Sequence, residues 1–141
     1  EIDDTRVAMP PGSSQGFGVV GRDAVPTFLF PPHPATALLL FEVLTRPLVR
    51  LGLGLEDPHR RVLQARLTSP VVSRKGRRGY VRGRLLREQG SGDYLLQPLG
   101  TSGTHLLTSL AEANGLLIVP DDVEDLTVDE QVSVAFLSNR R

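Results

Sequence analysis

The chain of 141 residues has no cysteine, which excludes disulfides, thiolate metal sites and a cysteine nucleophile. Its 16 basic and 16 acidic residues give a net charge of zero. No global field therefore attracts nucleic acid, and we expect no nucleic-acid partner. The longest apolar run, residues 37–41, is far shorter than the roughly 18 residues of a membrane span. No secretion leader is visible at the N-terminus, and together these features favour a cytoplasmic protein.

The first part of the chain reads as short strands followed by a helix. Strands are predicted at residues 5–9, 17–20 and 25–30, and the nearly continuous apolar character of the third indicates a strand covered on both faces. Pro34 suits the first turn of a helix. Apolar residues at three- and four-residue steps over residues 37–51 predict that helix. We expect a kink at Pro47 and an end at Gly52 and Gly54.

After residue 56 the apolar pattern changes to a period of two. Strands are predicted at residues 60–67, 77–88, 93–99, 115–120 and 130–137, with "GSGD" at 90–93 as a hairpin turn and residues 105–115 as a helical turn. We therefore place a domain boundary near Asp57. Residues 1–56 are predicted to be an α/β fragment, and residues 57–141 a small all-β domain.

The sequence offers few chemical motifs. It has no HExxH pair and no phosphate-binding glycine loop, and its histidines, His33, His59 and His105, are too far apart to suggest a metal site, so we expect none. The basic stretch from Arg74 to Arg87 could bind phosphate or an acidic peptide, or it could simply be the solvated side of a strand. The residues alone lead only to a soluble α/β fragment joined to a β domain.

Three segments in order resemble the MoeA/gephyrin E-domain family, the molybdopterin molybdenumtransferases. The first is "VAMPPGSSQGFG" followed by "FLFPPHPATALLLFEVLTRPLVRLG", the second is "RRVLQARLTSPVVSRKGRRGYVRGRLL", and the third is "LQPLGTSGTHLLTSLAEANGLLIVPDDVEDLTVDEQVSV". The third is the most specific. The match covers nearly all of this chain but only about the last third of a full-length family member.

The resemblance implies a fold and a function. Residues 1–56 would be the end of a MogA-like α/β domain, and residues 57–141 the family's C-terminal β-barrel-like domain, domain IV. Family members are elongated homodimers that insert molybdenum into adenylated molybdopterin. Their site also needs carboxylates and loops from earlier domains and from the partner subunit. We therefore expect molybdopterin, molybdate and Mg²⁺ to bind the full-length protein, and none of them to bind this chain alone.

The family's substrate loops match this chain with substitutions. Its Gly-Leu-Pro-Gly-Asn-Pro-Val-Ser motif aligns with residues 29–36, so that Pro32 replaces a glycine and His33 an asparagine, while Pro10 and Ser13 replace two lysines. Proline removes a backbone donor. Each lost charge-assisted hydrogen bond is worth roughly 1.5–3 kcal/mol, so binding should weaken. The implied substrate-binding residues are Pro10, Gly12, Ser13, Pro31, Pro32, His33, Pro34 and Thr36, with no catalytic residue.

Three interpretations remain open: part of an insertase, a catalytically degenerate gephyrin-like scaffold that binds a linear peptide, or a β domain without a ligand. In gephyrin a peptide's aromatic residues dock beside the segment that resembles "SRKGRRGYVRG" here. Alternation along that strand would place Arg78, Tyr80 and Arg82 on one face, as candidates for binding an acidic, aromatic peptide. The alternative is that Tyr80 packs into the barrel.

Overall fold

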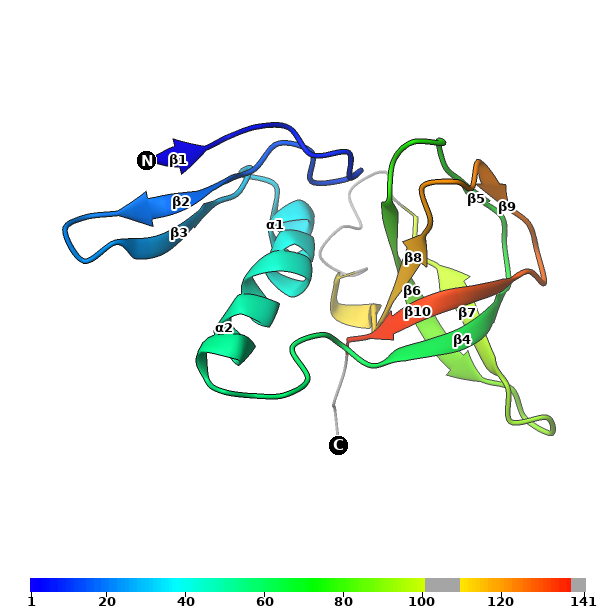
Figure 1. Ribbon diagram of the computed structural model, residues 1–141. Helices are drawn as coiled ribbons and strands as arrows, with labels where there is room; N and C mark the ends of the chain where they lie inside the picture. Colours follow the sequence, from blue (N-terminus) through cyan, green and yellow to red (C-terminus); the bar gives the residue numbers. More distant parts are fainter. Residues whose placement is uncertain (101–109, 138–141) are drawn as a thin grey trace. The chain divides into compact units, whose positions relative to one another are not determined.

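The computed structural model describes residues 1–100 and 110–137. Its contacts divide the chain into two compact units, Glu1–His59 and Arg60–Arg141, which are treated separately below (Figure 1). The domain boundary expected near Asp57 lies shortly before this division. No helix among the described residues is long and apolar enough to cross a membrane.

The first unit begins with a three-stranded antiparallel sheet. Strands β1 (Ile2–Asp3), β2 (Gly16–Val20) and β3 (Val25–Leu29) lie in that order, which confirms two of the predicted strands. The strand predicted at residues 5–9 is wrong. The Asp3 carboxylate accepts hydrogen bonds from the backbone N–H and the hydroxyl of Thr5, at 2.9 and 2.6 Å. Within residues 5–9 the Val7 N–H donates to the Ser13 carbonyl at 3.1 Å and the Met9 N–H donates to the Val7 carbonyl at 2.8 Å, so the segment is a loop where the apolar residues indicated a strand.

A helix with three segments follows the sheet. It consists of α1 (Pro34–Leu40), a π-helical turn η1 (Phe41–Thr45) and α2 (Arg46–Gly52). Pro34 lies in the first turn, as predicted. Pro47 lies at the start of α2, where its missing N–H matters least, and the preceding Arg46 N–H donates to the carbonyl of Phe41, five residues back. The wide π turn therefore accommodates the proline that we expected to kink the helix.

The helix ends at the glycines, as predicted. Gly54 has a positive φ of 72°, and the Leu55 N–H donates to the Arg50 carbonyl at 3.0 Å. This left-handed residue with a hydrogen bond back to the last turn is a common helix C-terminus, and it favours glycine because glycine has no Cβ.

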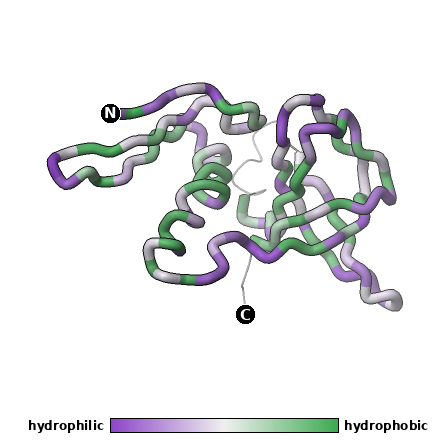
Figure 2. Tube along the Cα trace, in the orientation of Figure 1, coloured by the Kyte–Doolittle hydropathy of each residue, from purple (hydrophilic) through white to green (hydrophobic). Residues whose placement is uncertain are grey.

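Much apolar surface of the first unit is exposed. Apolar residues recur along the hairpin and the helix of this unit (Figure 2). Val25 and Leu29 of β3 are 54% and 50% exposed, so the expectation of a strand covered on both faces is wrong for this chain. Phe17 of β2 and Leu53 after the helix are exposed as well. The larger buried apolar residues of this unit are Met9, Ala35, Leu39, Leu40 and Pro47. A three-stranded sheet and one helix cannot enclose more than such a small core.

The second unit is a closed barrel of five strands. Its strands are β4 (Val62–Leu67), β6 (Gly79–Arg87), β7 (Tyr94–Pro98), β8 (Gly115–Val119) and β10 (Gln131–Phe136), in the order β10-β4-β7-β6-β8. Only β4 and β7 pair in parallel. A separate two-stranded antiparallel sheet is formed by β5 (Val71–Val72), which follows β4 in the sequence, and β9 (Asp125–Leu126), which precedes β10. All five predicted strands are confirmed.

The helical turn predicted at residues 105–115 falls partly outside the described residues. Residues 110–112 are helical. The following Asn114 is structural, because its carboxamide accepts a hydrogen bond from the Leu85 N–H at 2.6 Å and donates to the Leu85 carbonyl at 3.1 Å. The side chain thus continues the pairing of β6 beyond the point where β8 begins.

The barrel core is apolar and closely packed. Leu96, Leu117 and Val134 are completely buried, and each such side chain contributes about 1.5–3 kcal/mol through removal from water. Gly83 lies against this core, since a Cβ on it would lie 2.6 Å from Cδ1 of Leu96. The close approach of β6 to β7 at this point therefore requires a residue without a side chain.

Candidate functional site

The two loops matched to the family's substrate site leave the β2–β3 hairpin at the same end. Gly16, the first residue of β2, pairs with Leu29, the last residue of β3. The loop that precedes β2 and the loop that follows β3 therefore start from neighbouring positions. The pairing of β2 with β3 thus places the starts of two segments side by side that are about 20 residues apart in the sequence.

The first loop packs against the helix through Gly12. This residue is buried and has a φ of 108°, and a Cβ there would lie 2.9 Å from both Leu40 Cδ2 and Met9 Cε. The Val7 N–H donates to the Ser13 carbonyl at 3.1 Å, which closes the loop. The peptide between Pro10 and Pro11 is cis. Glycine is needed here both for space and for backbone conformation.

The second loop ends at the helix N-cap. His33 has an extended backbone and no side-chain cap bond, and its carbonyl accepts a hydrogen bond from the Ala37 N–H at 2.9 Å. Its Nδ1 lies 3.4 Å from Oγ1 of Thr36. Pro32, His33 and Pro34 are exposed and Pro31 is half-buried. The imidazole is thus oriented by Thr36 at the surface.

The two loops offer an anion few positive charges and few backbone N–H donors. Residues 9–16 and 30–37 contain no lysine or arginine, and His33 is their only residue that can gain a positive charge. Five prolines in these segments have no N–H to donate. The loops have the shape of a strand–loop–helix site but few of the charges that bind phosphate or molybdate.

The candidate peptide-binding residues lie on the barrel. Gly79, Gly83 and Leu85 of β6 are buried, whereas Tyr80 and Arg82 alternate with them and are half-buried. Tyr80 is not part of the barrel core, although Val81 beside it packs against that core. The third candidate, Arg78, is exposed in the segment before β6. The strand therefore presents Tyr80 and Arg82 on the face opposite the barrel interior.

Arg82 has an unusual environment. Its Nη1 atom is buried and has no hydrogen-bond partner among the described residues. This burial lowers the pKa of the guanidinium below its ordinary value, although an arginine stays charged at neutral pH. A buried, unpaired donor of this kind is costly.

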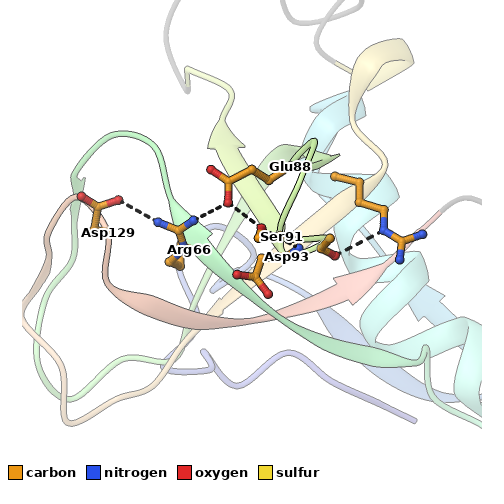
Figure 3. A network of polar contacts seen from close by, with 7 residues as sticks. Arg66, Glu88, Ser91, Asp93 and Asp129 are labelled. Atoms are coloured by element: carbon orange, nitrogen blue, oxygen red, sulfur yellow. Dashed lines mark hydrogen bonds and ion pairs between the residues drawn. The ribbon is translucent and has the colours of Figure 1, made fainter.

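A polar network that the sequence did not reveal lies elsewhere on the barrel (Figure 3). Arg66 Nη2 donates to Glu88 Oε2 at 2.7 Å, and Arg66 Nη1 lies 3.5 Å from Asp129 Oδ1. Ser91 Oγ also donates to Glu88, at 2.7 Å. The Ser91 hydroxyl and the Arg66 charge lower the pKa of Glu88. The alternating pattern placed Arg66 on a strand, but its partners are distant in the sequence.

The described residues suggest no metal centre. In residues 1–100 and 110–137, no three histidine, aspartate or glutamate side chains are placed to hold a metal ion. We therefore derive no Mg²⁺-dependent step for this chain.

Comparison with known proteins identifies the family. The family model for the MoeA C-terminal region (domain IV) matches residues 64–137, which includes every strand of the barrel from β6 to β10 and most of β4. The chain belongs to the MoeA family.

Two molybdopterin molybdenumtransferases match the first unit as well as the barrel. Molybdopterin molybdenumtransferase 1 of Mycobacterium tuberculosis is 54% identical over 141 residues, which cover 98% of this chain and 33% of the relative. Molybdopterin molybdenumtransferase 2 of the same organism is 37% identical over 133 residues, covering 94% of this chain and 31% of the relative. The MoeA chain thus spans about a third of the length of these relatives.

Solved structures agree with the fold. A MoeA protein from Pyrococcus horikoshii superposes with a TM-score of 0.79 at 31% identity, over 99% of this chain and 32% of the other. A molybdenum cofactor biosynthesis protein from Pyrococcus furiosus, at 24% identity and a TM-score of 0.77, shares the fold over 96% of this chain and 45% of the other. The expected architecture, an α/β fragment followed by a β-barrel, is confirmed.

Proposed function

We propose that this chain is the C-terminal part of a molybdopterin molybdenumtransferase, which inserts molybdenum into adenylated molybdopterin. The observation that carries the proposal is the 54% identity to such an enzyme over 98% of the chain, first unit included. The whole protein would be a cytoplasmic homodimer, and the first unit would complete a MogA-like domain with residues that precede it in the longer relatives.

The exposed apolar surface of the first unit supports this assignment. Phe17, Val25 and Leu29 are about half exposed on a short sheet, which is unusual for an independent domain. Further strands and helices of an α/β domain would cover such residues. Within the whole protein, the loops at Pro10–Ser13 and Pro31–Thr36 would then line one side of the substrate cleft.

The chain alone should not catalyse the insertion, because it spans only about a third of the length of its relatives and its two loops contain no carboxylate, lysine or arginine. The test is to incubate adenylated molybdopterin and molybdate with the purified chain and, separately, with the full-length protein. Turnover by the full-length protein alone supports the proposal. Turnover by the isolated chain would contradict this account of the loops, and inactivity of both would favour a scaffold.

A second experiment asks whether the loop substitutions have weakened substrate binding. In the full-length protein, Pro10→Lys and Ser13→Lys restore two cations, while Pro32→Gly and His33→Asn restore a backbone donor and an amide. Each regained charge-assisted bond is worth roughly 1.5–3 kcal/mol, or about ten-fold or more in affinity. Titration with molybdopterin should therefore show a large gain. Unchanged affinity would mean that these positions do not contact the substrate.

A second candidate function is a scaffold that binds a linear peptide. The observation that favours it is the pair Tyr80 and Arg82 on the outer face of β6, where the buried Nη1 of Arg82 has no partner among the described residues. A carboxylate of an acidic peptide could pair with the accessible part of the half-buried Arg82 guanidinium, and an aromatic residue could pack on the Tyr80 ring. Arg78, exposed nearby in the sequence, would add long-range attraction.

This candidate is tested with a fluorescent acidic peptide that contains phenylalanine. Tyr80→Ala should weaken its binding about ten-fold or more, as truncation of an aromatic anchor typically does. The melting temperature should change little, since Tyr80 is outside the core. Arg61→Ala, another exposed basic position of the barrel unit, is the matched control. A collapse of stability in Tyr80→Ala would instead make Tyr80 a structural residue.

A further inference from the structure

The start of β8 carries the only asparagine–glycine pair in the chain, Asn114 and Gly115. Such a pair can lose the side-chain amide without an enzyme, because the glycine backbone nitrogen can attack the side-chain carbonyl carbon and close a five-membered ring. Glycine favours the reaction since it has no side chain to shield the nitrogen and its backbone bends readily into the ring geometry. The other asparagine, Asn139, is followed by the bulky Arg140.

The barrel needs both residues of this pair. The Asn114 carboxamide accepts a hydrogen bond from the Leu85 N–H at 2.6 Å and donates one to the Leu85 carbonyl at 3.1 Å, which uses the acceptor and the donor of an amide together. Gly115 is buried, and a Cβ on it would lie 2.9 Å from Cγ1 of Val134. Because neither residue can be replaced without cost, the fold retains an intrinsically reactive sequence.

The same contacts keep the pair from reacting while the barrel is closed. Ring closure requires the Asn114 carboxamide to turn towards the nitrogen of Gly115, but its oxygen and its nitrogen are both bonded to Leu85 of β6. Gly115 also lies between two strands, paired with Gly83 of β6 and with Phe136 of β10 (Figure 1). Its backbone therefore reaches the ring geometry only by leaving these pairings.

We propose that Asn114 is a deamidation site that the closed barrel suppresses and that reacts when the start of β8 separates from β6. The Gly115 nitrogen then gives its proton to solvent and bonds to the Asn114 side-chain carbonyl carbon, while the amide nitrogen leaves as ammonia. Water opens the ring at either carbonyl and yields aspartate or isoaspartate. The net change exchanges NH₂ for OH and consumes only water.

The reaction would make a transient opening permanent. Aspartate lacks the amide donor to the Leu85 carbonyl and places a carboxylate beside that oxygen. Isoaspartate lengthens the backbone by a methylene directly before Gly115, so the pairings with Gly83 and Phe136 cannot both be restored in register. A barrel that has opened is thereby marked and closes less well afterwards.

The test compares the full 141-residue chain with a synthetic peptide of residues 110–119, which cannot form the barrel. Both are incubated in the same buffer, and site-resolved mass spectrometry follows the mass gain at Asn114. The peptide should react on the order of a hundred-fold faster or more, since paired and buried strand residues are rarely open. Equal rates would show that the barrel gives no protection. An inert peptide would show that the pair is not reactive, and either result would overturn the proposal.

Two variants link the rate to opening of the barrel. A Cβ in Gly83→Ala would lie 2.6 Å from Cδ1 of Leu96, opposite Gly115, and Leu96→Ala leaves a cavity in the core. Each should raise the rate at Asn114 by about 5–30-fold or more, and a variant that does not fold should react as fast as the peptide. Gly100→Ala, with no atom of the described residues within 4 Å of its Cβ position, is the matched control and should react at the original rate.

Asn114→Gln confirms the assignment of the site. Glutamine must close a six-membered ring, which forms far more slowly, so the mass gain at residue 114 should disappear. A mass gain that persists at this position, or rates in Gly83→Ala and Leu96→Ala that both equal the control, would contradict the proposal.

Discussion

Replacing Gly83 by alanine should destabilise the barrel because the added methyl group has no room. Its carbon would lie 2.6 Å from Cδ1 and 3.0 Å from Cγ of Leu96, and 3.1 Å from the Gln97 carbonyl oxygen. Carbon atoms in contact are normally about 3.5–4.0 Å apart. The neighbours must therefore move by roughly 1 Å, and Leu96 is completely buried. The clash cannot be relieved by turning this side chain towards solvent.

The expected cost follows from this geometry. Overpacking of a well-filled core typically costs about 1–3 kcal/mol. The lower chain entropy of unfolded alanine offsets about 0.4–1 kcal/mol of it. A net loss of about 1–2 kcal/mol corresponds to a drop in melting temperature of roughly 4–16 °C for a domain of this size. Thermal unfolding of the barrel, followed by circular dichroism, measures it directly.

A double-mutant cycle with Leu96→Ala isolates the contact. Leu96→Ala alone leaves a cavity and should cost about 2–5 kcal/mol. In the double variant the new methyl group occupies part of that cavity, so the combined loss should be smaller than the sum by about 0.5–3 kcal/mol. Gly100→Ala is the control, since no atom of the described residues lies within 4 Å of its Cβ position. A Gly83→Ala variant as stable as the control, or strict additivity, would refute the reasoning.

Three further predictions concern the barrel unit. Asn114→Ala should destabilise it by about 1–3 kcal/mol because both backbone groups of Leu85 lose their partner. Asn114→Asp keeps the acceptor and should cost less. Chemical denaturation of both variants measures the two losses. Glu88 has a lowered pKa, so its contribution to stability is present above the ordinary glutamate pKa and is lost as the pH falls through the lowered value. Glu88→Gln should therefore flatten the acid side of a profile of stability against pH. An unchanged slope would count against the Arg66 and Ser91 contacts. Residues 58–141, expressed alone, should melt cooperatively with a dispersed NMR spectrum, because the barrel has its own closed core; a molten spectrum would contradict this.

The strand β4 could be predicted because one of its faces is buried and the other is not. Its buried residues Ala65 and Leu67 are separated by the half-buried, polar Arg66, and that period of two is visible in the sequence. The end of the helix could also be predicted, since Gly54 has the positive φ that glycine tolerates best. These features depend on residues close to one another along the chain.

Other features depend on partners that the local sequence does not identify. Arg66 meets Asp129 across 63 positions, a contact set by the pairing of β4 with β10. The π turn at residues 41–45 depends on how the chain relaxes ahead of Pro47, for which periodicity gives no signal. The strand wrongly predicted at residues 5–9 is a further case, because the Val7 N–H donates to the Ser13 carbonyl within a loop and not to a neighbouring strand.

The pairing of the first barrel strand with the last has a consequence for protein architecture. Val62 at the start of β4 lies opposite Ala135 near the end of β10, and the Phe136 N–H donates to the Arg61 carbonyl at 2.9 Å. The polypeptide therefore enters and leaves the barrel at one point. A circular permutation that joins these neighbouring ends and opens the Gly90–Gly92 turn would keep every strand pairing. For the same reason, the barrel could be inserted into another protein by joining only its two neighbouring chain ends.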